Sequence, residues 1–473
     1  MKATRVENLI LEGPLPLKLR ERCTVRTTQW DEVLDNDTSQ MVWSARDVVT
    51  EAFEEVLPDC WILPRHAASL EELEEMGWET EDVPPSPIPF TYPRGPIPRD
   101  SVQEISIEEI QNEGTLVLPP GSGKTAIFLA AVAHSSQPAL IFVDNGGLFT
   151  QWMHAAKKHL GLSSDEIGSL QGPVASWTAD RPIVIGMYSS VTQALERGDF
   201  PAELTTRFGW VCWDEAPTAL TPTRFILLSL FHARRVALSA TPEKRGLEEL
   251  LYLHAGPIRV DVRKGDLEPK VHIAGIPCKA PNISPSNTRA YLKLMSHSLG
   301  GSRKGPNPAY LDAIVGTLRM LYDEGRKIMV LVPRSGAIRA IKDLIPDAAV
   351  LDQRTPFFAR MDRLNASNIV LVSTQIGEKG LDREDLDTLV VVFPFGKTAE
   401  GRFRQAAGRV LREYPNKPTP EVYFYYPDSV YGRQLGDAAE GISKSLGWET
   451  NHSRAARNTG RQSRVSAALK LSK

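Results

Sequence analysis

Short, continuous apolar runs alternate with helical patterns over most of this chain, and that alternation restricts its fold more than any other feature. The first series of runs is Thr115–Leu118, Ala139–Val143, Pro182–Ile185, Trp210–Trp213 and Arg235–Leu238. The second series is Lys327–Val332, Ala348–Leu351, Ile369–Val372, Thr388–Val392 and Glu421–Tyr425. Apolar strands separated by helices are typical of parallel sheets that are covered on both faces. We therefore predict an α/β chain with two tandem lobes.

Changes in composition mark the expected domain boundaries. At about 150 residues per domain, the chain has room for roughly three domains. Seven prolines fall within residues 84–98, where fixed φ angles and missing N–H donors favour an extended linker. The predicted divisions are an acidic N-terminal accessory domain (1–83), a proline-rich linker (84–98), a first lobe (99–270), a second lobe (271–450) and a basic, flexible tail (451–473).

The net charge of −3 is unevenly distributed. Residues 1–98 carry nine basic and nineteen acidic residues, whereas residues 451–473 carry six basic residues and no acidic one. Leu70, Leu73 and Met76 have helical spacing within the acidic stretch 69–82, which we interpret as a solvated helix face. Two readings stay open for each end: the acidic segment docks a protein partner or packs on the first lobe, and the tail contacts phosphates or only aids solubility.

The remaining composition favours a cytoplasmic protein. The four cysteines, at positions 23, 60, 212 and 278, are far apart and form no CxxC pair, which argues against a disulfide scaffold or a zinc site. No apolar run approaches the roughly 20 residues that a membrane helix needs, and the N-terminus lacks a signal-peptide core. We therefore expect no membrane association.

The sequence LPPGSGKT, residues 118–125, follows an apolar run and precedes a helical one, as a phosphate-binding loop requires. Glycines let backbone N–H groups approach phosphate oxygens, Lys124 adds positive charge, and Thr125 is a candidate Mg²⁺ ligand. The predicted nucleotide-binding residues of the loop are Pro120, Gly121, Ser122, Gly123, Lys124 and Thr125.

Two further motifs follow predicted strands of the first lobe. WVCWDEAP ends in Asp214 and Glu215; a carboxylate at a strand end holds Mg²⁺ in phosphate-loop enzymes, and an adjacent glutamate orients and deprotonates water. ALSATPEK contains Ser239, Ala240 and Thr241, which on their own resemble an ordinary turn that caps a helix.

The second lobe contains RQAAGRVLR, residues 404–412, on a predicted helix. Arg409 and Arg412 are three residues apart and would share one helical face. The guanidinium fork suits a γ-phosphate whose charge builds up in the transition state. The pattern Q-x-x-G-R-x-x-R makes Gln405, Arg409 and Arg412 candidate catalytic residues.

Taken in this order, the phosphate loop, DEA box, SAT segment and Q-x-x-G-R-x-x-R resemble those of superfamily 2 helicases and translocases, over roughly residues 95–435. The residues within these motifs are similar to those of the XPB-like and phage recombination-helicase branch. FVDNGGLFTQW (142–152), IVIGMYSS (183–190), MVLVPRSG (329–336) and STQIGEKGLD (373–382) match further motifs of that branch.

The resemblance implies two RecA-like lobes, with ATP and Mg²⁺ in the cleft between them. It assigns adenine recognition to Gln103, further nucleotide contacts to Gly380 and Asp382, Mg²⁺ to Thr125 and Asp214, and coupling to Ser239, Ala240 and Thr241. Nucleic acid, DNA rather than RNA, would lie across both lobes. The candidate nucleic-acid contacts are Asn145, Gly146, Gly147, Tyr188, Ser189, Arg334, Ser335, Thr374 and Gln375, mostly to phosphates.

Three residues depart from the family pattern. Pro120 replaces a threonine in the phosphate loop, Asp144 replaces a common proline, and Pro217 replaces the histidine or aspartate that ends the DEA box. The last change removes a side chain that hydrogen-bonds toward other motifs, so it bears on the coupling between hydrolysis and lobe movement.

The leading hypothesis is an ATP-dependent DNA helicase that unwinds or remodels DNA, including branched or forked DNA, in repair or recombination. The alternatives are a double-strand translocase motor without unwinding, an RNA helicase, and a nucleic-acid-binding scaffold with weak ATPase activity.

Overall fold

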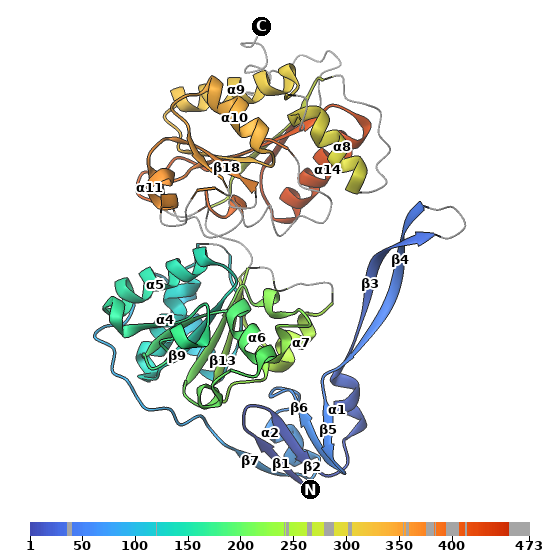
Figure 1. Ribbon diagram of the computed structural model, residues 1–473, viewed down its shortest axis with the longest axis vertical. Coiled ribbons are helices and arrows are strands. Elements are labelled where there is room, and N and C mark those ends of the chain that lie inside the picture. Colours follow the sequence, from blue (N-terminus) through green and yellow to red (C-terminus); the bar gives the residue numbers. More distant parts are fainter. Residues whose placement is uncertain are drawn as a thin grey trace. The chain divides into compact units, whose positions relative to one another are not determined.

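The computed structural model shows two compact units, and we describe each by itself (Figure 1). One unit comprises Met1–Leu118 and Gly123–Arg263, and the other Pro119–Ser122 and Lys264–Lys473. The structure describes residues 1–35, 40–119, 121–240, 242, 246–262, 267–278, 288–300, 305–352, 354–355, 359–374, 383, 385–393, 406–411 and 414–453.

The N-terminal domain of the first unit is built on a five-stranded sheet in the order β5-β6-β2-β1-β7. β1 (Lys2–Arg5) and β7 (Glu79–Asp82) are parallel, and the other neighbours are antiparallel. The remaining strands of this sheet are β2 (Leu9–Glu12), β5 (Glu54–Leu57) and β6 (Cys60–Leu63). Helices α1 (Leu17–Arg22) and α2 (Leu70–Glu75) complete the domain.

A long two-stranded hairpin extends from this domain (Figure 1). β3 (Thr24–Asp35) and β4 (Gln40–Glu51) pair antiparallel over twelve residues each, from Thr24 opposite Glu51 to Asp35 opposite Gln40. Both strands contain several valines and threonines, which favour extended backbone. The sequence interpretation did not include this hairpin.

The acidic stretch 69–82 is a helix only in its first half. Ser69 caps α2 by accepting a hydrogen bond from the Glu72 amide, but α2 ends at Glu75. The chain then turns through Gly77, whose φ of +83° favours glycine, and residues 79–82 form β7. The predicted helical spacing, which ends at Met76, is thus confirmed by α2, whereas the strand β7 was not predicted.

Lobe 1 contains a seven-stranded, all-parallel sheet in the order β10-β11-β9-β12-β13-β8-β14. The strands are β8 (Gly114–Val117), β9 (Ala139–Val143), β10 (Ile167–Leu170), β11 (Ile183–Met187), β12 (Trp210–Asp214), β13 (Arg234–Ser239) and β14 (Ile258–Asp261). The main helices are α3 (Ser101–Glu109), α4 (Lys124–Ser135), α5 (Gly146–Leu160), α6 (Tyr188–Arg197) and α7 (Glu248–Ala255). The edge strands β10 and β14 were not among the predicted runs.

Each face of this sheet has its own core, because successive strand residues point to opposite sides. Ile141 and Val143 belong to the core that includes α4 and α5, whereas Leu140 and Phe142 belong to the core that includes α6 and α7. Buried side chains of the N-terminal domain extend this second core; they include Leu9, Leu11, Leu63, Leu73 and Trp78. The N-terminal domain therefore packs on lobe 1, one of the two readings that the sequence left open.

The proline-rich stretch 84–98 contains no helix or strand, and it lies against lobe 1 (Figure 1). The Phe90 amide donates to the Ser136 carbonyl at 2.8 Å. Tyr92 is buried, and its hydroxyl donates to the carbonyls of Gln137 and Pro182. These contacts anchor the linker to α4 and the neighbouring strand ends.

Lobe 2 repeats the architecture with an all-parallel, seven-stranded sheet in the order β17-β18-β16-β19-β20-β15-β21. The strands are β15 (Lys270–Ile276), β16 (Ile328–Val332), β17 (Ala349–Leu351), β18 (Ile369–Ser373), β19 (Thr388–Val391), β20 (Glu421–Pro427) and β21 (Thr450–Ser453). The helices are α8 (Thr288–Leu299), α9 (Pro308–Asp323), α10 (Ser335–Leu344), α11 (Arg360–Asn365) and α14 (Val430–Ser445). Two all-parallel sheets confirm the predicted α/β class with tandem lobes.

The start of the predicted tail belongs to lobe 2. Residues 450–453 form β21, which pairs with β15 from Val271 opposite Thr450 to Ala274 opposite Ser453. The other tail residues, 454–473, lie outside the described residues. In the part of the chain that the structure describes, every helix falls short of the length and hydrophobicity that crossing a membrane requires.

Candidate functional site

The phosphate loop lies where the sequence places it, between β8 and α4. Gly121 and Gly123 have φ angles of +85° and +82°, a region that side chains rarely adopt. Gly123 caps α4, which begins at Lys124, and the N-terminus of a helix favours an anion. Lys124 Nζ donates to the Leu118 carbonyl at 2.9 Å, a bond that folds the side chain back over the loop.

Gln103 lies against the same loop. Its side chain is buried, and a Cβ atom added to Gly123 would sit 2.5 Å from Gln103 Nε2 at the end of that side chain. Gln103 Oε1 accepts a hydrogen bond from the Arg99 amide, and Asp100 Oδ1 accepts one from the Gln103 amide. These contacts hold Gln103 beside the loop. Its role in adenine recognition stays a prediction.

Asp214 ends β12, and its carboxylate is almost completely buried. Oδ2 accepts a hydrogen bond from Trp152 Nε1 at 2.8 Å, and Oδ1 accepts one from the Glu215 amide at 3.0 Å. Burial raises the pKa of Asp214, while the Trp152 hydrogen bond, the charge of Lys124 and the Glu215 amide oppose that rise. Each oxygen accepts one bond from the protein, so each keeps a lone pair for a cation.

The backbone turns sharply after Asp214. Glu215 has a φ of +49°, an unfavourable left-handed conformation for a residue with a side chain. The 3₁₀ turn η5 (Ala216–Ala219) follows, with Pro217 in its first turn and the Thr218 amide bonded to the Glu215 carbonyl at 2.8 Å. This turn fixes the direction of the chain after the end of β12, where Glu215 lies.

The SAT segment is joined to the phosphate loop through the sheet. Ser239 and Ala240 are buried at the end of β13, and the Ser239 carbonyl accepts a hydrogen bond from the Leu118 amide at 3.0 Å. β13 lies between β8 and β12, so the loop, Ser239 and Asp214 share the carboxyl edge of one sheet. Thr241 lies outside the described residues.

The predicted nucleic-acid contacts in lobe 1 divide into two kinds. Gly146 has open space around it, and Ser189 is exposed. Asn145 caps α5 by accepting hydrogen bonds from the amides of Gly147 and Leu148, and Gly147 is buried. Tyr188 is fully buried against Phe142, and its contact with nucleic acid stays a prediction.

The second lobe contributes fewer described site residues. Arg334 precedes α10 and donates to Ser296 Oγ at 2.8 Å, while Ser335 is exposed and Thr374 is half-buried. Arg409 is half-buried in a turn, and its amide lies 3.3 Å from the Ala406 carbonyl. Seven predicted site residues lie outside the described part of the chain: Pro120, Thr241, Gln375, Gly380, Asp382, Gln405 and Arg412.

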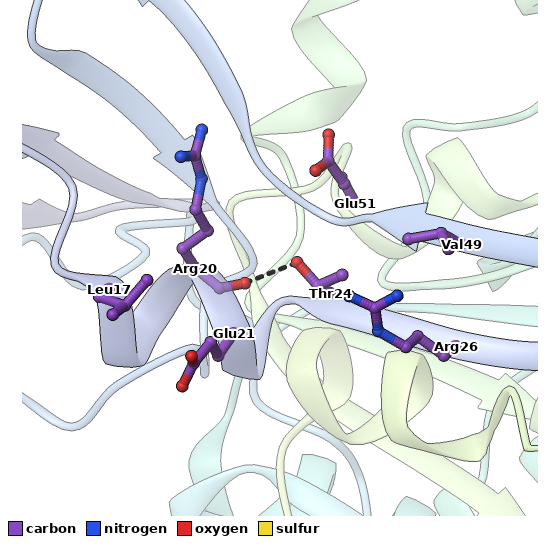
Figure 2. Close-up of a pocket in the computed structure, with 7 residues that line it drawn as sticks. All are labelled: Leu17, Arg20, Glu21, Thr24, Arg26, Val49 and Glu51. Carbon is purple, nitrogen blue, oxygen red and sulfur yellow. Dashed lines mark hydrogen bonds between the residues drawn. The ribbon is translucent and has the colours of Figure 1, made fainter.

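A pocket in the described structure lies elsewhere, at the foot of the hairpin beside α1 (Figure 2). It is lined by Leu17, Arg20, Glu21, Thr24, Arg26, Val49 and Glu51. Thr24 Oγ1 donates to the Arg20 carbonyl at 2.7 Å. The pocket contains none of the predicted site residues.

Two residues without a predicted role contact the motifs of lobe 1. Trp152 ends the quoted run FVDNGGLFTQW but was given no role, because nothing in the sequence pairs it with Asp214, 62 residues further on. Arg224, which contacts Asp144, Thr218 and Tyr188, lies in a segment that matches none of the motifs.

Comparison with known proteins gives a consistent result. Residues 98–244 match the family model described as "Type III restriction enzyme, res subunit". The chain is 27% identical over 317 residues to a putative DNA 3'-5' helicase Rad25 of Haloarcula marismortui, covering 64% of this chain and 48% of that protein. It is 32% identical over 169 residues to a DNA 3'-5' helicase XPB of Kineococcus radiotolerans, covering 35% and 30%.

The match thus spans about half the length, or less, of these curated relatives. Among solved structures, S. cerevisiae Dbp5 bound to RNA and ADP BeF3 has a TM-score of 0.55 at 11% identity, covering 79% of this chain and 92% of that one, which shows a shared fold. By sequence the chain is thus similar to proteins named as DNA 3'-5' helicases of the Rad25 and XPB type, and its two lobes share the fold of Dbp5.

Proposed function

We propose that this protein is an ATP-dependent DNA helicase that unwinds or remodels DNA. The observation that carries the proposal is the shared carboxyl edge of the lobe 1 sheet. There the phosphate loop after β8 and the buried Asp214 at the end of β12 flank Ser239. The relatives named as DNA 3'-5' helicases support DNA over RNA.

The residues present fit a nucleotide with its Mg²⁺. The first turn of α4 offers N–H donors to the phosphates, and Lys124 supplies a positive charge beside them. Thr125 and Asp214 would hold the metal, whose charge would offset that of the phosphates during hydrolysis. Gln103 would recognise the adenine.

Glu215 would orient the attacking water and take its proton. Its position directly after the buried strand and at the start of a constrained turn keeps the carboxylate at the sheet edge. From the sequence pattern alone, we also propose that Gln405, Arg409, Arg412, Gly380 and Asp382 act on the same nucleotide.

Nucleic acid would be held through phosphates by the loop Asn145–Gly147, by Ser189, and by Arg334, Ser335, Thr374 and Gln375 of lobe 2. The helix N-terminus at Asn145 favours an anion, and Gly146 leaves room for one. Such contacts read no bases, so binding would be independent of sequence. A cytoplasmic location and a protein partner for the acidic N-terminal domain stay predictions.

The test is the ATPase rate with single-stranded, duplex, forked and four-way DNA and with RNA, combined with a strand-separation assay. We expect DNA to stimulate hydrolysis and ATP to drive unwinding. Hydrolysis without strand separation would indicate a translocase, stimulation by RNA alone would overturn the DNA assignment, and no stimulation by any nucleic acid would favour a scaffold.

The first prediction concerns the lysine of the phosphate loop. Lys124→Ala should reduce ATP turnover to the background rate, because the positive charge at the phosphates is lost, while the melting temperature stays unchanged. Lys157→Ala is a matched control, since this lysine lies in the last turn of α5, away from the loop. An unchanged kcat in Lys124→Ala would contradict the proposed nucleotide site.

A further inference from the structure

Arg224 lies at a junction of three strand ends in lobe 1. Its Nη1 atom donates to Asp144 Oδ1 at 2.7 Å and to the Thr218 carbonyl at 3.3 Å. Its guanidinium also lies over the Tyr188 ring, 5.3 Å from the centroid. Asp144 directly follows β9, Tyr188 follows β11, and Thr218 lies in the turn after β12.

The two acceptors of Arg224 belong to segments with different proposed tasks. Asp144 adjoins Asn145, which caps α5 and begins the loop proposed to hold nucleic-acid phosphates. Thr218 is in η5, the turn that begins directly after Glu215. One side chain therefore joins the proposed nucleic-acid loop to the turn that carries the proposed water-activating glutamate.

This junction is shielded from solvent. The side chains of Arg224 and Asp144 are 24% and 14% exposed, so their attraction is screened less than that of a surface pair. Tyr188 is fully buried, with its ring stacked on Phe142 and its hydroxyl 3.4 Å from the Asp214 carbonyl. A planar guanidinium that makes two hydrogen bonds and stacks on an aromatic ring has little freedom to rotate.

Because position 217 is a proline, another residue must link the turn after Glu215 to the rest of lobe 1. A proline side chain has no donor or acceptor, so position 217 at the end of the DEA box cannot supply the hydrogen bond of a histidine or aspartate. Glu215 nevertheless adopts an unfavourable φ of +49°, which the surrounding structure must maintain. The contact from Arg224 to the Thr218 carbonyl tethers the turn on its far side.

We propose that the Asp144–Arg224 pair couples occupation of the Asn145–Gly147 loop by nucleic acid to the placement of Glu215. Arg224 and Asp144 are positioning residues: neither touches the nucleotide, and Arg224 acts through η5. A phosphate bound at the N-terminus of α5 shifts or orders Asp144, Arg224 transmits this to Thr218, and the turn then holds Glu215 for water activation. The inference rests on the proposed function. It assigns the stimulation of ATP hydrolysis by nucleic acid to one ion pair.

The experiment compares wild type, Arg224→Gln, Asp144→Asn and the double variant. The readouts are the ATPase rate with and without single-stranded DNA, the KM for ATP, the Kd for DNA and the melting temperature. We expect each variant to lose stimulation by about tenfold, a typical coupling between sites. The rate without DNA and the KM for ATP should stay close to wild type.

The double variant distinguishes the pair from two separate effects. If the pair is the link, the second substitution adds little to the first, because the interaction is already broken. Arg224→Lys should retain only part of the stimulation, since an ammonium group keeps the charge but lacks the planar fork. Arg181→Gln, which breaks a comparable but exposed pair with Asp180, is the matched control and should keep full stimulation.

Two outcomes overturn the inference by itself, and a third overturns it together with the proposed function. Equal stimulation in wild type and in all three variants would show that the pair carries no coupling. A fall in melting temperature and basal rate with an unchanged stimulation ratio would show that Arg224 only stabilises the fold. A wild type that no nucleic acid stimulates would overturn the proposed function, and this inference with it, so the two failures are distinguishable.

Discussion

At the scale of single residues, the hydrogen bond from Trp152 to Asp214 is the contact on which the proposed metal site most depends. Asp214 is buried, and its orientation is fixed by one side-chain donor and one backbone donor. Partners that orient a metal ligand typically affect metal affinity or activity by about 10- to 100-fold. Trp152 is therefore as much a part of this site as the acidic pair itself.

Trp152→Phe tests this role, because phenylalanine keeps an aromatic ring in the core but removes the N–H donor. We expect kcat to fall by about 10- to 100-fold and the affinity for Mn²⁺ in the presence of ADP to weaken, the latter measured by electron paramagnetic resonance. Trp177→Phe is the matched control, since the Trp177 indole donates only to the Gly172 carbonyl. Unaltered Mn²⁺ binding in Trp152→Phe would show that the hydrogen bond does not position Asp214.

Residues also show why the site was only partly predictable. Lys124, Asp214 and Glu215 lie in motifs whose spacing and flanking strands can be recognised in the sequence. Trp152 and Arg224 act across 62 and 80 residues of sequence separation, through partners that only the fold brings near. The burial of Tyr188 against Phe142 was not predictable either, because a residue at a strand end can point inward or outward.

At the scale of elements, the N-terminal domain is joined to lobe 1 by a buried ionic cluster as well as by the shared core. Arg65 follows β6 and donates two hydrogen bonds, both of 3.0 Å, to Glu113, which precedes β8. His66 Nε2 also lies 3.1 Å from Glu113, and the His66 amide donates to the Leu253 carbonyl in α7. Arg235 of β13 donates to the Glu7 carbonyl of the N-terminal domain.

Disrupting this ionic cluster should destabilise the packing of the N-terminal domain on lobe 1. Glu113→Gln leaves the Arg65 guanidinium buried without its partner charge, so we expect the free energy of unfolding to fall by about 3–5 kcal/mol. Urea unfolding followed by tryptophan fluorescence measures this. Asp82→Asn, which breaks the more exposed pair with Arg5, should cost about 1 kcal/mol or less. Equal losses in the two variants would argue against a special role for the buried pair.

The same cluster predicts a pH dependence. Burial alone would raise the pKa of Glu113, but the His66 hydrogen bond and the Arg65 charge lower it from 4.5 to about 2. Because the folded pKa is depressed, the contribution of this carboxylate to stability is complete above about pH 4.5 and is lost as the pH falls toward 2. Glu113→Gln should therefore flatten this part of the acid-unfolding profile.

Buried helices and strands could be predicted from the sequence more completely than partly exposed ones. Central strands such as β9 and β12 are continuous apolar runs, and their bounds differ little from the expected ranges. The edge strands β10 and β21 are short and partly polar, and β21 pairs with a strand that is distant in sequence. The hairpin β3–β4 mixes acidic and β-branched residues, so its local signal was masked by the charge of the segment.

At the scale of the whole molecule, the basic residues of the chain's end are separable from the fold. Strand β21 ends at Ser453, and all six basic residues of the predicted tail lie beyond it. Deleting residues 454–473 therefore removes the positive charge and leaves the sheet of lobe 2 complete. A deletion that began at residue 450 would also uncover the edge of β15.

We expect the 454–473 deletion to reduce the slope of log K against log salt for DNA binding, by about 0.7 for each single-strand phosphate that the tail neutralises. Binding isotherms at several salt concentrations measure this, and replacing the six basic residues with glutamine is the control for chain length. A slope equal to that of the intact protein would mean that the tail aids solubility only.

The anchoring of the N-terminal domain has a mechanical consequence for the hairpin. Strands of twelve residues span about 40 Å, and the domain that bears them shares its core with lobe 1. The hairpin is thus an arm of about 40 Å on a domain that packs on lobe 1. A rotation of that lobe by about 10° would move the far end of the hairpin by about 7 Å. This displacement is about as large as two base-pair steps of DNA.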